Sequence, residues 1–187
     1  MEEAKVIDIL KNKLGFLDSS IKKLKKFHSY LLEYNQRYNL ISKNTEKSIW
    51  ERHILDSAQI IKFIDVSNDK KIVDFGSGAG FPGLIIALHN KNLRFHVKLY
   101  DKSTVKRGFL SKIKEKLDIK NIDIKNDVYA DKIEADVVVC RAFKKLGEIL
   151  KISREIVKKP HKLIILKGKN AQSEINNVSL GSNYSYK

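Results

Sequence analysis

The chain has 187 residues, a length that suits one α/β domain with a small extension, and 42% of its residues are hydrophobic. No apolar run approaches the ~20 residues of a membrane span, and the acidic N-terminus lacks an apolar signal core, so we expect no membrane association and no secretion. Cys140 is the single cysteine, which excludes an internal disulfide and favours a cytoplasmic location. The net charge of +15 favours a polyanionic partner.

The first third of the chain is predicted to be helical. A short helix begins it, and a long one follows over residues 21–38, where apolar positions recur every three to four residues. Ser19 or Ser20 is the expected N-cap of this long helix. A third helix is expected over residues 45–64. Because no strand alternates with these helices, residues 1–67 are expected to form an N-terminal helical cap.

From residue 68 onward, short apolar runs alternate with helical stretches. The apolar runs predict strands near 71–75, 95–100, 121–125, 136–140 and 162–167. The helical stretches between them cover 82–90, 103–117 and 145–158. This alternation predicts βα units and a mostly parallel sheet that binds ligands at the carboxyl ends of its strands. Residues 68–187 are therefore expected to be an α/β core that forms one compact unit with the cap.

The stretch VDFGSGAGFPG, residues 73–83, follows the first predicted strand directly. Glycines at a strand end permit positive φ angles and let a ligand approach the backbone closely. Pro82 suits the first turn of a helix, where its missing N–H costs nothing. We therefore predict that this loop holds a small molecule at a helix N-terminus. A P-loop is excluded, because no Gly-Lys-Ser/Thr follows.

Two cofactors fit the spacing of the glycines. Gly78, Gly80 and Gly83 satisfy G-x-G-x-x-G, so a nicotinamide dinucleotide, and with it an oxidoreductase, stays open as an alternative. Asp74 before the glycines makes the string D-x-G-x-G-x-G, the pattern of S-adenosylmethionine sites, where a carboxylate can lie near the sulfonium and amino groups. Asp101, at the end of the second strand, can accept both ribose hydroxyls of either cofactor.

Six segments, which together cover about residues 40–168, occur in the order of one known family. They are YNLIS (38–42), RHILDS (52–57), VDFGSGAGFPG (73–83), LYDKSTVKRGFL (99–110), CRAF (140–143) and LKG (166–168). With these segments the chain resembles the bacterial small-subunit ribosomal RNA guanine-N7 methyltransferases, also called glucose-inhibited division protein B. The resemblance implies a class I methyltransferase fold, Rossmann-like with five or six strands, and S-adenosylmethionine as methyl donor. It also implies ribosomal RNA or the small ribosomal subunit as partner, and we expect a monomer.

The resemblance assigns roles to individual residues. Gly76 and Phe81 would line the cofactor loop, and Asn126 and Asp127 correspond to the pair that contacts the adenine end, although the family usually has a small residue and glutamate there. Arg141 corresponds to the family's arginine after the fourth strand. The predicted cofactor-binding residues are therefore Asp74, Gly76, Gly78, Phe81, Asp101, Asn126, Asp127 and Arg141.

Arg141 is also the predicted catalytic residue, since a strand-end arginine can grip phosphate or stack on guanine. Guanine N7 carries an exposed lone pair and no proton, so we expect catalysis by positioning without a dedicated base. The predicted substrate-binding residues are Asn39, Arg52, His53 and Lys167. An ion pair between cap and sheet is the alternative for Arg52 and His53, and a solvated strand end is the alternative for Lys167. No metal site is expected, because no second His or Cys stands at ligand spacing from His53.

The remaining features have plainer interpretations. Cys140 is interpreted as a buried structural thiol, and Lys102, Lys106 and Arg107 as a solvated helix face. The family continues into a terminal antiparallel hairpin, but residues 170–187 cannot supply both a helix and a hairpin. We therefore expect at most one short strand there and a less stable chain. A non-catalytic RNA-binding relative is a second alternative to the methyltransferase.

Overall fold

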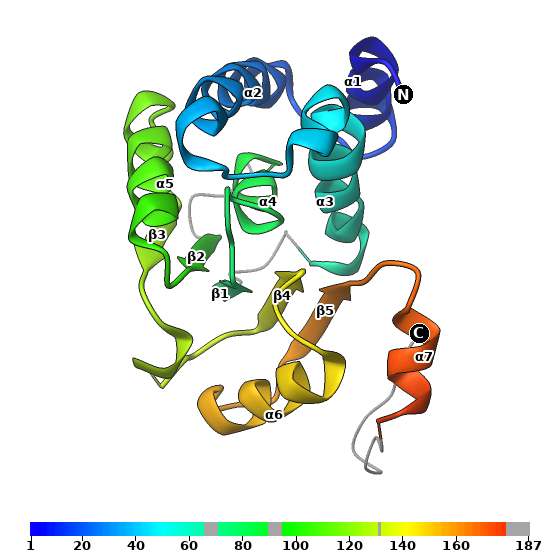
Figure 1. Ribbon diagram of the computed structural model, residues 1–187, viewed down its shortest axis with the longest axis vertical. Coiled ribbons are helices and arrows are strands. Elements are labelled where there is room, and N and C mark those ends of the chain that lie inside the picture. Colours follow the sequence, from blue (N-terminus) through cyan, green and yellow to red (C-terminus); the bar gives the residue numbers. More distant parts are fainter. Residues whose placement is uncertain (66–70, 90–94, 131, 179–187) are drawn as a thin grey trace.

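The computed structural model describes residues 1–65, 71–89, 95–130 and 132–178, and within them one parallel sheet carries the strand order β3-β2-β1-β4-β5 (Figure 1). The strands are β1 (Lys71–Phe75), β2 (His96–Tyr100), β3 (Ile122–Lys125), β4 (Val137–Arg141) and β5 (Lys162–Leu166). Each lies within one residue of its predicted bounds. The predicted parallel sheet of five or six strands is thus confirmed in the described part of the chain.

The direction of the strand order reverses between β1 and β4. From β1 the chain proceeds to β2 and β3 on one side, while β4 lies on the other side of β1 and is followed by β5. Ligands of open α/β sheets bind outside the carboxyl ends of the strands at such a point. Phe75, which pairs with both Tyr100 and Cys140, is the last residue of β1, and the glycine loop begins directly after it. The fold therefore places this loop where a ligand is expected.

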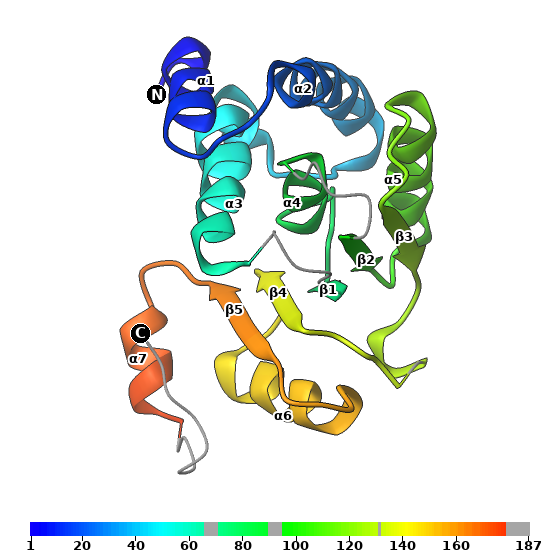
Figure 2. The ribbon, with the colours of Figure 1, turned by 180° about the vertical axis from the view of Figure 1, so that it is seen from behind.

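Helices cover both faces of the sheet. The crossovers between parallel strands all have the same hand, but the chain proceeds in opposite directions across the sheet on the two sides of β1. For this reason α4 (Gly83–His89) and α5 (Thr104–Lys116) lie on one face of the sheet and α6 (Leu146–Ile156) lies on the other (Figures 1 and 2). The three helices predicted for this region are confirmed, with ends that differ by one or two residues. Pro82 stands directly before α4, and its carbonyl accepts the N–H of Ile86.

The N-terminal helices lie on the same face as α4 and α5 (Figure 1). They are α1 (Glu3–Asn12) and α2 (Asp18–Tyr38), and α2 buries the predicted stripe with Ile21, Leu24, Phe27 and Leu31. The predicted N-cap was wrong, since α2 begins at Asp18 and Leu17 holds the cap position without a side-chain hydrogen bond. Ser20 lies inside the helix and is buried, while Asp18 contributes negative charge to the first turn.

The helix predicted over residues 45–64 is confirmed as a helical segment over residues 43–63, but it is not a regular α-helix. The chain forms a 3₁₀ turn η1 (Lys43–Ser48), a π turn η2 (Trp50–Leu55), a short α3 (Asp56–Ala58) and a second 3₁₀ turn η3 (Gln59–Phe63). Ile49, Trp50, Ile54 and Leu55 are buried in this segment, and five positions separate Ile49 from Ile54 and Trp50 from Leu55. That spacing is compatible with the i→i+5 hydrogen bonds of a π turn, and the buried residues Trp50, Ile54 and Ala58 also keep the α-helical spacing of four.

Two buried hydrophobic clusters sandwich the sheet, and the alternation of side chains along β4 decides what its last residues reach. Val137 and Val139 belong to the cluster that includes the cap, whereas Val138 and Cys140 belong to the cluster beneath α6. Arg141 follows in the first set, so its side chain points toward the cap. Cys140 is buried on the opposite face, as predicted.

After β5 the chain forms a helix, α7 (Ala171–Asn176), which the sequence reading had not placed. Lys167 and Glu174 form an ion pair of 2.7 Å that joins α7 to the end of β5. The short strand considered for the tail falls largely on residues 179–187, outside the described residues. Within the described residues, every helix is too short or too polar to cross a membrane.

Candidate active site

The glycine loop after β1 adopts backbone angles that only glycine takes easily. Gly76, Gly78 and Gly80 have φ angles of 73°, 58° and 105°. A Cβ atom added at Gly80 would lie 2.8 Å from the Cβ of Leu84, so this glycine is packed against the start of α4. A Cβ added at Gly78 would meet only the carbonyl oxygen of Gly76, at 3.9 Å. The backbone at Gly78 therefore faces open space that a ligand can enter.

Asp74 lies beneath the loop rather than in front of it. Its side chain is fully buried, and Oδ2 accepts the N–H of Gly83 at 2.8 Å, which fixes the start of α4 against β1. Oδ1 is buried and has no hydrogen-bond partner among the described residues. Burial raises the pKa of this carboxyl group to about 7. Contact with a ligand at Asp74 stays a prediction, and its visible task is to hold the loop.

Asp101 fastens the open side of the loop. One carboxylate oxygen accepts the N–H of Gly78 at 2.9 Å, and the other accepts the N–H of Ser103 at 2.8 Å. Ser103 caps α5 by accepting the N–H of Lys106. The carboxylate thus joins the glycine loop to the end of β2, in the position where the sequence predicted ribose binding. Each oxygen keeps a further lone pair that can accept a hydroxyl hydrogen.

Arg107 has a role that the sequence did not reveal. The sequence reading left it on a solvated helix face, but its Nη1 donates to the carbonyl oxygens of Asp101 and Lys102 and to Oδ1 of Asn126, at 2.7–2.8 Å. Arg107 therefore holds the ends of β2 and β3 together and orients Asn126. Its position in the first turn of α5, six residues after Asp101, was the available signal.

Asp127, the other residue of the predicted adenine pair, is also engaged. Its carboxylate forms an ion pair of 3.0 Å with Lys102 and accepts the N–H of Tyr129 at 3.1 Å. Lys102 in turn lies 5.4 Å from the centre of the Tyr129 ring, which is half-exposed. Asn126 and Asp127 are thus presented at the carboxyl end of β3, next to Asp101. Their contact with adenine stays a prediction.

Arg141 bridges the sheet and the cap. Its guanidinium donates to the carbonyl oxygen of Arg52 at 2.8 Å and to Nδ1 of His53 at 2.5 Å. It also lies 5.0 Å from the centre of the Phe81 ring, on which the His53 ring is stacked at 5.0 Å. The alternative of an ion pair between cap and sheet is therefore replaced by hydrogen bonds and ring contacts. The structure brings together three predicted site residues, Arg141, His53 and Phe81.

The hydrogen bonds of His53 fix its protonation. Arginine only donates hydrogen bonds, so Nδ1 of His53 must be the unprotonated acceptor. Nε2 then carries the hydrogen and faces Oγ1 of Thr45 at 2.9 Å, while Thr45 donates to the carbonyl oxygen of Ser42 at 2.8 Å. Burial, together with the charges of Arg141 and Arg52, lowers the pKa of His53 to about 4. The imidazole is therefore neutral near pH 7.

A buried asparagine holds the loop that supplies Thr45. Asn35, only 1% exposed, accepts the N–H of Ile41 at 2.8 Å and donates to a carboxylate oxygen of Glu46 at 2.5 Å. Neither Asn35 nor Thr45 was singled out in the sequence as a site residue. The hydrogen bonds of these two residues show that the contacts that hold Arg141 in place, through His53 and Thr45, continue into the cap.

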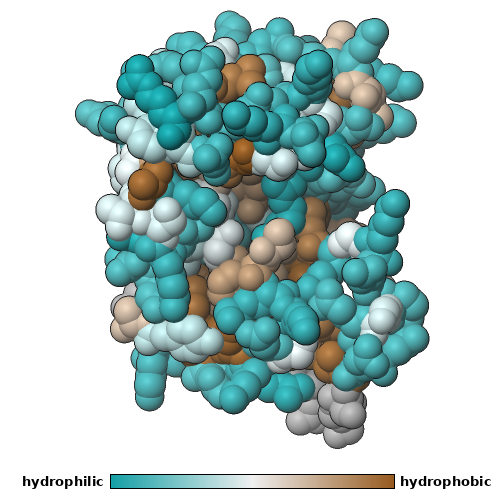
Figure 3. Space-filling view, in the orientation of Figure 1, coloured by the Kyte–Doolittle hydropathy of each residue, from teal (hydrophilic) through white to brown (hydrophobic). Residues whose placement is uncertain are grey.

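Phe143 is a further residue that the sequence analysis did not place in the site. It packs 5.9 Å from the ring of Phe75, and a Cβ added at Gly76 would lie 2.5 Å from its ring. The phenyl ring thus lies against the backbone of the first loop glycine. Figure 3 shows hydrophobic side chains in the recessed middle of this face of the molecule, with hydrophilic residues around them.

The side chains of three predicted substrate-binding residues take no part in the contacts around Arg141. Asn39 ends α2 in the left-handed conformation, with φ 46°, and its side chain is exposed. The side chain of Arg52 is exposed as well. Lys167 donates to the carbonyl oxygen of Lys144 at 2.8 Å in addition to its ion pair with Glu174, so the predicted solvated strand end does not describe it. Substrate contacts at these residues stay predictions.

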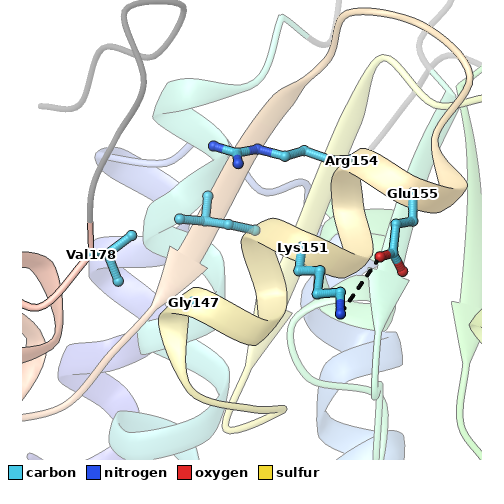
Figure 4. Close-up of a pocket in the computed structure, with 6 residues that line it drawn as sticks. Gly147, Lys151, Arg154, Glu155 and Val178 are labelled. Atoms are coloured by element: carbon cyan, nitrogen blue, oxygen red, sulfur yellow. Dashed lines mark ion pairs between the residues drawn. The ribbon is translucent and has the colours of Figure 1, made fainter.

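Two cavities away from the loop do not carry comparable chemistry. One, of about 240 Å³, lies on the outer side of α6 between Gly147, Arg154 and Val178, with the ion pair of Lys151 and Glu155 at its rim (Figure 4). The other, of about 320 Å³, lies at the opposite end of the sheet from the glycine loop and is lined by several lysines. Among the described residues there is no group of three His, Cys, Asp or Glu side chains that could hold a metal ion.

The fold and the loop together define a class of enzyme. The chain resembles a solved S-adenosylmethionine-dependent O-methyltransferase from Thermotoga maritima with a TM-score of 0.54 and 19% identity, over 65% of this chain and 47% of that one. It also resembles precorrin-6y C5,15-methyltransferase from Geobacter metallireducens, with a TM-score of 0.52 and 12% identity, over 65% and 66% of the two chains. The protein has the class I methyltransferase fold.

Sequence relatives narrow the class to one family. The family model for rRNA small subunit methyltransferase G matches residues 20–182. Ribosomal RNA small subunit methyltransferase G of Pelagibacter ubique is 37% identical over 165 residues, covering 86% of this chain and 77% of the relative. The enzyme of the same name from Orientia tsutsugamushi (strain Ikeda) is 34% identical over 184 residues, covering 97% and 89%.

The chain belongs to the rRNA small subunit methyltransferase G family. The resemblance seen in the six segments is confirmed, and the protein is a methyltransferase. The nicotinamide-dependent oxidoreductase that the glycine spacing left open is not supported by either the family or the fold.

The residues around the glycine loop fit S-adenosylmethionine, the cofactor of this methyltransferase. Gly78 leaves open space before the backbone, as a bound ligand requires, and Asp101 carries acceptors next to it. Three features therefore follow one another across the sheet. The backbone of the glycine loop lies at the carboxyl end of β1, the carboxylate of Asp101 at that of β2, and the pair Asn126 and Asp127 at that of β3. This arrangement suits a nucleoside with an amino-acid tail.

Proposed function

We propose that this enzyme transfers a methyl group from S-adenosylmethionine to N7 of a guanine in small-subunit ribosomal RNA. The names of the relatives support ribosomal RNA of the small subunit as the substrate. The observation that carries the proposal is the placement of Arg141, whose guanidinium lies beside the glycine loop and is fixed by Arg52 and His53 of the cap.

The chemistry requires little from the protein beyond orientation. When bound, S-adenosylmethionine supplies a methyl group that is attached to a positively charged sulfur. The sulfur leaves readily as a neutral thioether when the methyl group is transferred. Guanine N7 carries a lone pair and no proton, so no side chain must remove one. A fixed guanidinium can bind the O6 edge of guanine or a neighbouring phosphate and so align N7 for attack. Arg141 is therefore proposed as the residue that positions the base.

Cys140 does not act as a nucleophile in this proposal. It is fully buried on the α6 side of the sheet, and burial raises the pKa of its thiol to about 12. A thiol that stays protonated and faces away from Arg141 cannot form a covalent adduct with the base. Direct transfer to a ring nitrogen needs no such adduct, which is consistent with this burial.

The cofactor-facing roles are proposed for residues at three strand ends. Gly76, Gly78 and Phe81 would shape the loop around the amino-acid part of the cofactor. Asp101 would accept the ribose hydroxyls, and the pair Asn126 and Asp127 would contact adenine. Arg107 supports this proposal because it holds Asn126 in place from α5.

The test is methyl transfer to unmodified ribosomal RNA. The purified protein would be incubated with isotope-labelled S-adenosylmethionine in three separate reactions. One contains naked small-subunit RNA, the second contains assembled subunits and the third contains assembly precursors. Mass spectrometry of nuclease fragments should find label on N7 of one guanine in at least one substrate. Label on another atom, or no label with any of the three, would overturn the proposal. The second outcome would favour a non-catalytic RNA-binding relative.

A further inference from the structure

We propose that a surface formed by α2 and α5 binds single-stranded RNA next to the active site, and this inference rests on the proposed function. The surface consists of Tyr30, Tyr34 and Tyr38 of α2 and Lys112 and Lys116 of α5. We call it the tyrosine–lysine surface. Figures 1 and 2 show α5 beside α2, with α1 on the far side of α2.

The tyrosines form a row on one side of α2. They are spaced by four residues, which places their rings on one helical face about 6 Å apart along the axis. The ring of Tyr34 lies 6.2 Å from that of Tyr38 and 5.4 Å from the ring of Phe109, which is buried in the core. Tyr38 is 48% exposed. The row is therefore anchored at its base and open to solvent at its end.

Two lysines of α5 lie over this row. Nζ of Lys116 is 4.7 Å from the centre of the Tyr30 ring, and Nζ of Lys112 is 5.3 Å from that of Tyr34. Within the described part of the chain neither lysine forms an ion pair, whereas Lys114 of the same helix contacts Asp123 at 3.8 Å. Their charges are thus held against aromatic faces rather than neutralised by carboxylates.

Such a surface fits RNA by its chemistry. Bases of any sequence stack on exposed aromatic side chains such as Tyr38, and the lysines that lie over the other two rings can bind phosphates of the same strand. A lysine over an exposed tyrosine ring is held only weakly, so a phosphate can displace it from the ring at small cost. The net charge of +15 supports a polyanion as partner.

The position of the surface links it to the reaction. α2 ends at Tyr38, and the next helical turn along the chain, η1, contains Thr45, the partner of His53. α5 begins at Thr104, directly after Ser103, which Asp101 binds. Both helices therefore start or end beside the proposed active site. An RNA strand whose guanine reaches Arg141 can continue along the row of tyrosines.

The proposal can be tested by RNA binding without methyl transfer. The probe is a fluorescein-labelled, unmodified transcript of small-subunit ribosomal RNA, and its affinity is measured by anisotropy over a series of salt concentrations. Lys112→Glu combined with Lys116→Glu should lower the affinity about tenfold at low salt and reduce the salt dependence by about two counterions. Tyr38→Leu should lower the affinity about tenfold through lost stacking, with little loss of fold stability because the ring is half-exposed.

The matched control carries the same change of charge elsewhere. Lys5→Glu combined with Lys22→Glu alters two exposed lysines outside the tyrosine–lysine surface. This control should keep most of the affinity, and S-adenosylmethionine binding should be equal in all variants. Equal RNA affinity for the surface variant and the control would overturn the proposal, even if the parent methylates guanine N7. Binding to phosphatidylglycerol vesicles is measured for the same proteins. If the surface variant loses vesicle binding but keeps RNA binding, the proposal is overturned in favour of a membrane partner.

Discussion

The guanidinium of Arg141 donates a hydrogen bond to Nδ1 of His53, and this bond ties the end of β4 to the cap. Because the bond requires an unprotonated Nδ1, the arginine and the neutral imidazole depend on each other. The low pKa of His53, about 4, has burial as its largest cause, with the charge of Arg141 as the next. The residue that should orient the substrate is thus itself oriented by the cap.

His53 is therefore expected to act through Arg141. His53→Leu should lower kcat for methyl transfer about tenfold, because Arg141 loses an acceptor, and should leave S-adenosylmethionine affinity nearly unchanged. His53→Asn places an amide oxygen near the position of Nδ1 and should restore most of the rate. Steady-state kinetics with both substrates would separate kcat from KM. Equal rates for the Leu and Asn variants would contradict this role.

Gly78 should be indispensable for the cofactor and dispensable for folding. Gly78→Val would place a branched side chain in the open space before the loop and strain a backbone with φ 58°, so S-adenosylmethionine affinity should fall by at least about tenfold. Isothermal titration calorimetry measures this directly. Gly108→Val is the matched control, since a Cβ there meets nothing within 4 Å and the residue lies in α5. Retained affinity in the Gly78 variant would remove this glycine from the cofactor site.

Arg107 should affect cofactor binding although it is not expected to touch the cofactor. Arg107→Lys keeps the charge, but lysine is one bond shorter and has a single nitrogen. It therefore cannot reproduce the bonds of Nη1 to Asp101, Lys102 and Asn126 together with that of Nη2 to Thr104. We expect about tenfold weaker S-adenosylmethionine binding and a small fall in thermal stability. Lys106→Arg in the same helix turn is the control for a changed basic side chain. Unchanged affinity in Arg107→Lys would show that Asn126 needs no support.

The sequence predicted the fold well because the signals were local. Each strand of the core is a short apolar run closed by polar or glycine residues, and that pattern survives in the sheet. The position of Arg141 on the cap side also follows from alternation along β4. The π turn that contains His53 could not be predicted in this way, since a helical repeat of three to four residues was assumed over residues 45–64.

Side-chain roles that depend on contacts distant in sequence were less accessible. Asp74 stands in a motif where a carboxylate can face the ligand, yet the structure buries it under Gly83. Arg107 is one of several basic residues at the start of α5. Its distance of six residues from Asp101 does not reveal its bond to Asn126, which the pairing of β3 with β2 brings near. The sequence pattern alone shows neither how deeply a carboxylate is buried nor which residues lie beside the end of a strand.

Asp74 should give the protein a stability that falls as the pH rises. Its folded pKa of about 7 lies above its ordinary value of 3.8, so from about pH 4 to pH 7 the unfolded chain loses a proton that the folded chain keeps. The stabilising effect of the bound proton is complete below pH 4 and is lost as the pH passes 7. Asp74→Asn, which keeps an oxygen acceptor for Gly83, should therefore gain stability relative to the parent over this range, by about 4 kcal/mol at most.

His53 titrates with the opposite sign in the same range, and the experiment must separate the two. Its folded pKa of about 4 lies below the ordinary 6.5, so its contribution is complete above pH 6.5 and is lost as the pH falls toward 4. The difference in unfolding free energy between Asp74→Asn and the parent cancels this contribution, because both proteins contain His53. Urea unfolding at several pH values should show that difference rising between pH 4 and 7 and constant above it. A difference that does not change with pH would mean that Asp74 is ionised in the folded protein throughout.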